Sequence, residues 1–178
     1  MTAGTSSGRH QSAILIPVHD ADAVVEPFRL EYDPVATAGV PPHITLIVPW
    51  LPPVEIRPAD LDELADALHS SEAFDFLLAR VRWFGRRVLW LAPEPVQPFL
   101  DLVQLLSERF GTPPYEDEFD EVVPHLTVGH ASDGAELSGV ADQLMAKLPI
   151  KCRAEEVWVM VGDGHRWSVK KKIGLGGG

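Results

Sequence analysis

The chain of 178 residues has a single cysteine, which excludes an internal disulfide. That residue, Cys152, lies in a segment expected to be a strand, where a buried and unreactive thiol is the usual finding. No apolar run approaches the roughly 18 residues of a membrane-spanning helix. Residues 1–11 also lack the apolar segment of a secretory signal. These absences predict a cytoplasmic protein with no membrane partner.

Positive charge is scarce as well. Lys and Arg number 15 against 26 Asp and Glu, which gives a formal net charge of −11. Proteins that bind a long nucleic acid neutralise many phosphates with Lys and Arg, so no long nucleic-acid track is expected. A small nucleotide or the end of an RNA, held in a local pocket, is compatible with this charge. The basic residues cluster in two stretches, 80–87 and 166–172.

Hydrophobic residues make up 46% of the chain and charged residues 23%, as in ordinary globular proteins. A chain of this length forms one domain, or two small lobes that share a core. Residues 1–11 and 174–178 are polar or glycine-rich and are predicted to be flexible. The folded domain is therefore expected over residues 12–173.

Strands and helices alternate along this domain. Apolar runs and two-residue alternation predict strands, whereas apolar residues spaced by three and four predict helices. Helix 22–33 is the weakest prediction, because Pro27 fits only a first turn. The predicted strands are 13–18, 43–50, 74–84, 88–92, 122–131, 150–161 and 165–173, and the predicted helices are 22–33, 58–68, 99–110 and 137–148.

The order strand, helix, strand, helix, strand occurs twice, in halves of about 12–84 and 88–173. Such a repeat of roughly 80 residues is typical of a duplicated unit. Two copies would pack about a pseudo-twofold axis, with equivalent strands meeting near that axis.

The middle strand of each half carries the same short phrase. Pro42-His43-Ile44-Thr45-Leu46 returns 82 residues later as Pro124-His125-Leu126-Thr127-Val128. Side chains on a strand alternate between its two faces, so His and Thr share one face and the aliphatic residues share the other. Two such strands near one axis would place two imidazoles and two hydroxyls around one small cavity.

A bare His-x-Ser/Thr pattern is weak, since five of the seven histidines satisfy it. Only His43 and His125 follow a proline within an aliphatic strand, at matching places in the two halves. His130 lies five residues after His125, so alternation predicts that it faces the other way.

Metal binding is the competing interpretation, because His and nearby carboxylates can ligate zinc. The sequence contains no His-x-x-x-His and no pair of cysteines. No metal site is therefore predicted, although a metal-dependent hydrolase stays an alternative. A nucleotide-binding module without turnover is the other alternative.

The paired phrases, their separation and the chain length resemble the 2H phosphoesterase superfamily, also called the 2′-5′ RNA ligase family, which includes cyclic phosphodiesterases. Its signature is two His-h-Ser/Thr-h motifs, where h is hydrophobic, one in each of two related lobes. The resemblance implies an α+β fold over residues 12–173, in which two pseudo-twofold-related lobes of mostly antiparallel sheets face a central cleft with helices outside.

The resemblance also implies four catalytic residues, His43, Thr45, His125 and Thr127, with no metal and no cofactor. Family members often carry a basic residue soon after the second motif. Here that region is Gly129-His130-Ala131, without Arg or Lys. This departure, together with the acidic net charge, weakens the expectation of RNA-ligase activity.

Hydrolysis of a cyclic phosphodiester suits these residue types. One histidine can take a proton from water while the other gives a proton to the leaving ribose oxygen, and the threonine hydroxyls can bind the non-bridging oxygens. Which histidine is acid and which is base stays open. The expected partner is a small nucleotide or an RNA 3′-end, bound by a monomer, and the predicted substrate-binding residues are Tyr115, Arg82, Trp83 and Trp167.

Overall fold

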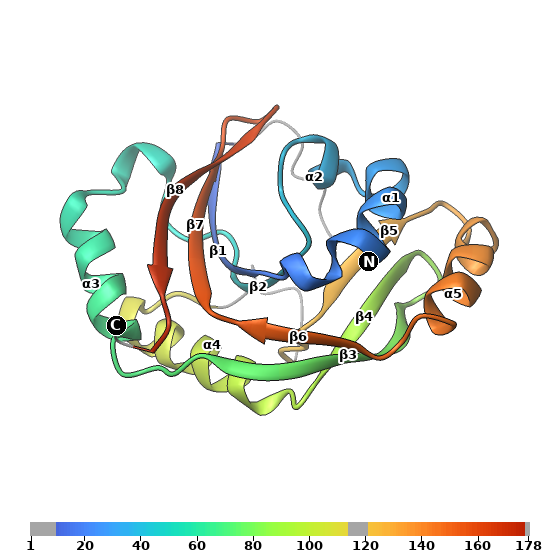
Figure 1. Ribbon diagram of the computed structural model, residues 1–178. Helices are drawn as coiled ribbons and strands as arrows, with labels where there is room; N and C mark the ends of the chain where they lie inside the picture. Colours follow the sequence, from blue (N-terminus) through green and yellow to red (C-terminus); the bar gives the residue numbers. More distant parts are fainter. Residues whose placement is uncertain (1–9, 114–120, 177–178) are drawn as a thin grey trace.

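The computed structural model describes residues 10–113 and 121–176. Two four-stranded antiparallel sheets form the framework (Figure 1). The first sheet has the order β2 (His43–Ile47), β1 (Gln11–Pro17), β7 (Glu156–Gly162) and β8 (Trp167–Gly174). The second sheet has the order β5 (Leu126–His130), β4 (Val88–Glu94), β3 (Phe74–Phe84) and β6 (Ile150–Ala154).

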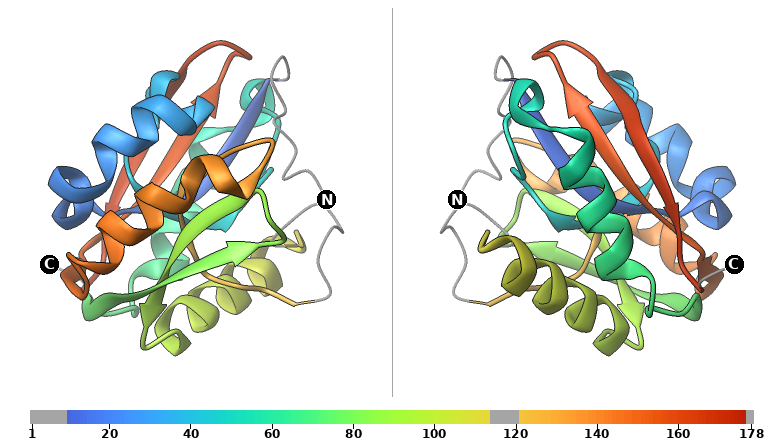
Figure 2. Two further views of the ribbon diagram at one scale, coloured as in Figure 1. Left: turned by 90° about the vertical axis from the view of Figure 1, so that its right-hand side faces the viewer. Right: turned by 90° about the vertical axis from the view of Figure 1, so that its left-hand side faces the viewer.

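The helices pack in two pairs on opposite sides of the sheets (Figure 2). On one side α3 (Pro58–Leu68) contacts α4 (Gln97–Phe110), and α4 contacts β2. On the other side α1 (Asp22–Tyr32) contacts both α5 (Ser138–Met145) and β5, and the short α2 (Pro34–Thr37) follows α1. None of the described helices is long and apolar enough to cross a membrane.

The two halves of the chain exchange strands. β3 follows the first motif strand in sequence but pairs with β4 and β6 in the second sheet. β7 and β8 come at the end of the chain but complete the first sheet beside β1. The strand orders β2-β1-β7-β8 and β5-β4-β3-β6 therefore correspond, as a pseudo-twofold arrangement requires.

One hydrophobic core joins the two sheets and the helices α1, α3, α4 and α5 that pack on them. The aliphatic residues of both motifs, Ile44, Leu46, Leu126 and Val128, are buried in it. Because side chains alternate along a strand, His43, Thr45, His125 and Thr127 point away from this core. A smaller cluster, formed by Leu15, Val40, Trp158 and Met160, covers the other face of the first sheet.

The segment 150–161, predicted as one strand, is two strands in different sheets. β6 ends at Ala154 beside β3, and β7 begins at Glu156 beside β1. The exposed Glu155 lies at the crossing, and its carbonyl accepts a hydrogen bond from the N–H of Leu175. The segment contains neither Gly nor Pro before Gly162, so no turn residue in the sequence marks the change of sheet.

The chain is ordered beyond two predicted limits. β1 begins at Gln11, which pairs with Gly162. At the other end Leu175 is buried, and the N–H of Gly176 donates to the carbonyl of Ser71. The prediction of a flexible end from residue 174 is therefore wrong for residues 174–176, because one apolar side chain and two backbone hydrogen bonds hold them.

Helix α1 continues through Pro27, contrary to the expectation that this proline permits only a first turn. Pro27 is exposed, whereas Val25 and Arg29 are buried on the other side of the helix. Packing of that buried side compensates for the backbone hydrogen bond that proline cannot donate.

The contact between α1 and β5 gives a test of the fold. A Cβ placed on Gly129 would lie 2.6 Å from the Cβ of Tyr32, whereas one on Gly139 would meet no heavy atom within 4 Å. Gly129→Ala should lower the free energy of unfolding by about 1–3 kcal/mol, because α1 must move away from β5. Gly139→Ala, inside α5, should raise it by roughly 0.5–1 kcal/mol. Denaturant unfolding measures both, and equal effects of the two substitutions would contradict this packing.

Candidate active site

The two motif strands lie side by side. β2 is the edge strand of the first sheet and β5 is the edge strand of the second sheet, and these two edges contact each other. The motifs, 82 residues apart in sequence, therefore meet at the junction of the two sheets.

Strand pairing shows where each motif side chain lies. Thr45 is opposite Leu15 on β1, and Thr127 is opposite Trp90 on β4. His43 is the first residue of β2, and His125 immediately precedes β5. All four motif side chains are half-buried, so they are partly shielded from water without being sealed from it.

Both histidines make the same hydrogen bond. His43 Nδ1 lies 2.8 Å from the carbonyl oxygen of Pro41, and His125 Nδ1 lies 2.7 Å from that of Val123. A carbonyl oxygen can only accept, so each Nδ1 carries the hydrogen and donates it. Each neutral ring therefore keeps its lone pair on Nε2, the atom left for proton transfer.

Their surroundings favour the neutral form of both rings. Burial lowers the pKa of His43 to about 4, helped by the nearby charges of Arg29 and His125 and opposed by the carbonyl of Pro41. Burial also lowers the pKa of His125, with a further contribution from His130 and opposition from the carbonyl of Val123. An anionic ligand between the rings would favour protonation of one of them.

Two aromatic residues hold His125. The ring of Phe84 meets the imidazole edge-to-face at 4.8 Å between centroids, and the ring of Trp90 does so at 5.8 Å. Phe84 and Trp90 are themselves stacked, with centroids 4.6 Å apart. These rings restrict the orientation of His125 and exclude water from one side of it.

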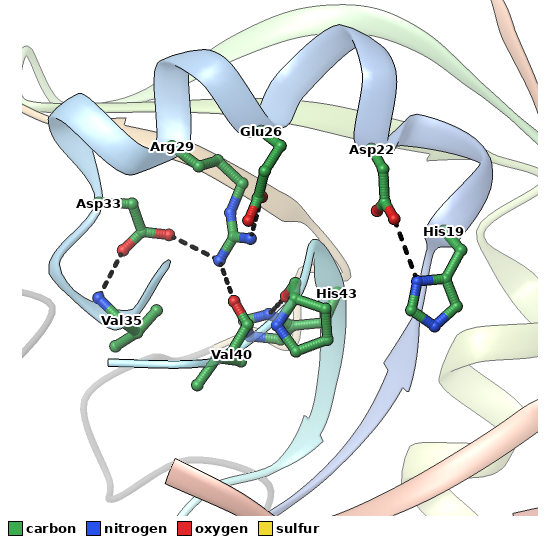
Figure 3. Close-up of polar contacts among 9 residues, drawn as sticks. His19, Asp22, Glu26, Arg29, Asp33, Val35, Val40 and His43 are labelled. Atoms are coloured by element: carbon green, nitrogen blue, oxygen red, sulfur yellow. Dashed lines mark hydrogen bonds and ion pairs between the residues drawn. The ribbon is translucent and has the colours of Figure 1, made fainter. Parts of the chain in front are cut away.

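His43 has a different neighbour, the guanidinium of Arg29 on α1. Arg29 is fully buried, and Figure 3 shows it between Glu26, Asp33 and the carbonyl of Val40, close to His43. Among the described residues, the two motif histidines thus have unlike environments, one beside a buried cation and one between aromatic rings.

The predicted substrate-binding residues separate into two groups. Arg82 is opposite Trp90, and Trp90 is opposite Thr127, so Arg82 is exposed on the same sheet face as Thr127. Trp83 is opposite Leu89 and packs against the hydrophobic core, so it points away from that face. A substrate contact for Trp83 stays a prediction that this placement does not favour, because neighbouring residues of a strand face opposite ways.

Trp167, at the start of β8, lies against Gly162 and the small cluster around Leu15 and Trp158. Strand pairing puts it on the same face of the first sheet as Thr45, but its ring is occupied by this packing. Tyr115, the fourth predicted substrate-binding residue, falls outside the described residues.

A bulge in β5 changes the face on which His130 lies. Trp90 pairs with Thr127, but Val88, two residues earlier on β4, pairs with His130 three residues later. The extra residue reverses the alternation, so His130 shares the face of Thr127 and is close enough to lower the pKa of His125. The prediction that His130 faces the other way is wrong for this reason.

Comparison with known proteins identifies the family. The model of the 2′-5′ RNA ligase superfamily matches residues 16–166. The chain belongs to the 2′-5′ RNA ligase superfamily. The resemblance of its two motifs to the 2H phosphoesterases is thereby confirmed, and membership supports a phosphodiesterase-type role. No curated protein matches the chain.

Solved structures show that the α+β fold is shared. E. coli LigT complexed with 3′-AMP superposes with a TM-score of 0.59 at 16% identity, covering 93% of this chain and 98% of that chain. E. coli LigT complexed with NADP+ gives 0.57 at 18% identity, covering 95% and 99%. A Thermus thermophilus protein gives 0.56 at 16% identity, covering 93% and 97%.

Two residues beside the motif histidines, Trp90 and Arg29, were not predicted from the sequence, and Trp83 was predicted to bind substrate in preference to Phe84. Arg82 and Phe84 are two residues apart on one strand, so alternation puts Phe84, and not Trp83, on the same face as Arg82. Trp90 lies in a continuously apolar strand that gives no sign of which face is which. Arg29 lies four residues after the apolar Val25 and so shares its side of the helix, but an arginine is rarely fully buried. Among the described residues, no three His, Cys, Asp or Glu side chains gather in a group that could hold a metal ion.

The low pKa of His43 gives a test of this geometry. Between pH 6.5 and about 4 the unfolded chain binds more protons than the folded one at this site, so the free energy of unfolding should fall as the pH falls. His43→Asn removes this contribution, and the pH dependence of unfolding should become less steep across that window. Denaturant unfolding at several pH values measures it. His69→Asn at an exposed position is the control, and parallel curves for His43→Asn and the unchanged protein would contradict the burial of His43.

Proposed function

We propose that this protein is a metal-independent phosphodiesterase that hydrolyses 2′,3′-cyclic or 2′,5′-linked phosphodiesters of nucleotides or RNA ends. The observation that carries the proposal is the matched pair of histidines. Each donates from Nδ1 to a carbonyl two residues earlier, and each keeps Nε2 for proton transfer. Two equivalent proton-transfer groups on adjoining strands suit a reaction that needs a base and an acid at once.

In the proposed reaction, one imidazole Nε2 takes a proton from water as the water oxygen attacks phosphorus. The bond from phosphorus to a ribose oxygen breaks on the opposite side, and the second imidazole, protonated at the start, gives its proton to that oxygen. The products are a phosphate monoester and a ribose hydroxyl. The two histidines end with their protonation states exchanged and return through solvent.

The threonines complete the proposed site. Thr45 and Thr127 lie two residues after the histidines on the same strand faces, so their hydroxyls can donate to the non-bridging oxygens of the bound phosphate. The negative charge of that phosphate would also raise the pKa of the nearer histidine and so provide the protonated member of the pair.

The proposed substrate is small. E. coli LigT, which shares the fold, has been crystallised with 3′-AMP, with NADP+ and with ATP. The net charge of −11 disfavours extended contact with an RNA backbone. A nucleotide or the 3′-terminal residues of an RNA therefore suit this chain best, with Arg82 as the nearest candidate for a contact with substrate on the second sheet.

The decisive experiment is hydrolysis of 2′,3′-cyclic nucleotides and 2′,5′-linked dinucleotides in EDTA. His43→Ala and His125→Ala should each lower kcat by about 10²–10⁴-fold, and the double variant should lose little more, because the two act as a unit. His69→Ala is the control, and product analysis separates 2′- from 3′-phosphates. Full activity in both single variants would refute the proposal. Loss of activity in EDTA with recovery in zinc or manganese would indicate a metal-dependent hydrolase instead, and thermal stabilisation by nucleotides without product would indicate a binding module.

Arg82 provides a second test. If its guanidinium contacts the substrate, Arg82→Ala should raise KM by roughly 10-fold with little change in kcat. This factor corresponds to the loss of about one charge-assisted hydrogen bond. Arg86→Ala, in the turn just beyond β3, is the matched control and should leave KM unchanged. Steady-state kinetics measure both, and equal KM values for the two variants would remove Arg82 from the site.

A further inference from the structure

Arg29 is a fully buried cation that the proposed reaction does not use. Its Nη1 donates to Glu26 at 2.9 Å, and its Nη2 donates to Asp33 at 3.2 Å and to the carbonyl oxygen of Val40 at 3.1 Å. Its Nε is buried without a hydrogen-bond partner among the described residues. An apolar side chain would serve packing in this place at a lower cost in desolvation.

The hydrogen bond to Val40 connects helix α1 to the first motif. Val40 precedes Pro41, and the carbonyl of Pro41 accepts the hydrogen bond from His43 Nδ1. Arg29 therefore restrains the peptide unit next to the one that orients the imidazole (Figure 3). The short segment 40–42 joins α2 to β2, and the N–H of Val18 donates to the carbonyl of Pro42 while the N–H of Val40 donates to that of Val35. The Arg29 guanidinium is the side chain that holds the carbonyl of Val40.

The charge of Arg29 acts on the same ring. Glu26 on α1 and Asp33 just after it partly offset this charge, and burial raises the pKa of Asp33 against the opposite effect of Arg29. From the second motif, His125 is near enough to act on the pKa of His43, and His130 is near enough to act on those of Asp33 and His125. Of these groups, Arg29 is the one that carries a permanent positive charge beside His43.

The corresponding helix of the second half carries no such group. In the sequence, α4 comes between β4 and β5, just as α1 comes between β1 and β2. In space, α4 packs on β2 and α1 packs on β5. The residues that α4 buries are all apolar, namely Phe99, Leu102, Val103 and Leu106. The cation beside His43 is therefore a feature of one half only, within the described residues, and it makes the two motif histidines unequal.

We propose that Arg29 is a positioning residue for His43, which orients the imidazole through Val40 and Pro41 and keeps it unprotonated until an anionic substrate binds. Its effect on catalysis rests on the proposed phosphodiesterase reaction, whereas its effect on the titration of His43 does not. The first can fail while the second holds.

The primary experiment is an NMR titration of the His43 imidazole in the full-length protein. In the unchanged protein the pKa of this imidazole should lie well below 6.5. In Arg29→Gln its pKa should rise by about one unit or more, whereas Arg29→Lys, which retains the charge, should keep it low. The double variant Arg29→Met/Asp33→Asn, which leaves no unpaired Asp33, should behave as Arg29→Gln does. Arg109→Met is the control, since Arg109 pairs with Glu63 on the exposed sides of α4 and α3.

Kinetics separate positioning from a merely structural role. Arg29→Gln should lower kcat by roughly 10- to 100-fold with a smaller change in KM. In the plot of kcat/KM against pH, the limb that reports His43 should shift to higher pH. Arg29→Lys should recover part of kcat. A lower melting temperature with unchanged His43 pKa and unchanged kcat per folded molecule would overturn the proposal.

Two outcomes keep this proposal distinct from the proposed function. If the unchanged protein hydrolyses none of the substrates, the phosphodiesterase assignment fails, and the His43 titrations still decide the role of Arg29. If Arg29→Gln does not fold, the double variant Arg29→Met/Asp33→Asn decides, because it leaves no unpaired charge at this place: a His43 pKa as low as in the unchanged protein overturns the proposal, and a raised one supports it. A His43 pKa at or above 6.5 in the unchanged protein also overturns it.

Discussion

The contact between the edge strands β2 and β5 is the constraint on which the rest of the structure depends. Each motif buries two aliphatic residues in the shared core, and the period of two then directs its His and Thr to the other face. A slip of one residue in either strand would bury polar groups and expose aliphatic ones. The free energy that favours the core thus also maintains the register of the candidate site.

Strand exchange makes this arrangement a property of the whole chain. β3 and β7 each complete the sheet that contains the other motif, so neither half can form its sheet alone. The exchange also brings α1 of the first half against β5 of the second. The result is a symmetric frame with unlike surroundings, a buried guanidinium beside His43 and two aromatic rings against His125. Acid–base chemistry needs such a difference, because its two groups must hold different protonation states.

Local patterns predicted most elements, and their failures have physical causes. Periodicity placed β3 at Phe74–Phe84, where the structure has it. It did not separate β6 from β7, because no Gly or Pro stands between them and only the pairing partner changes. It also put His130 on the wrong face, since a bulge depends on the neighbouring strand β4 and not on the sequence of β5.

The sequence by itself determined which residues carry the candidate chemistry and which face of its strand each occupies, because alternation is a property of the extended backbone. Tertiary structure alone decided that the two motifs adjoin, that Phe84 and Trp90 rather than Trp83 meet the second motif, and that Arg29 lies beside His43. These relations join residues far apart in the chain. They follow from how sheets and helices share one core, which no local pattern of residues records.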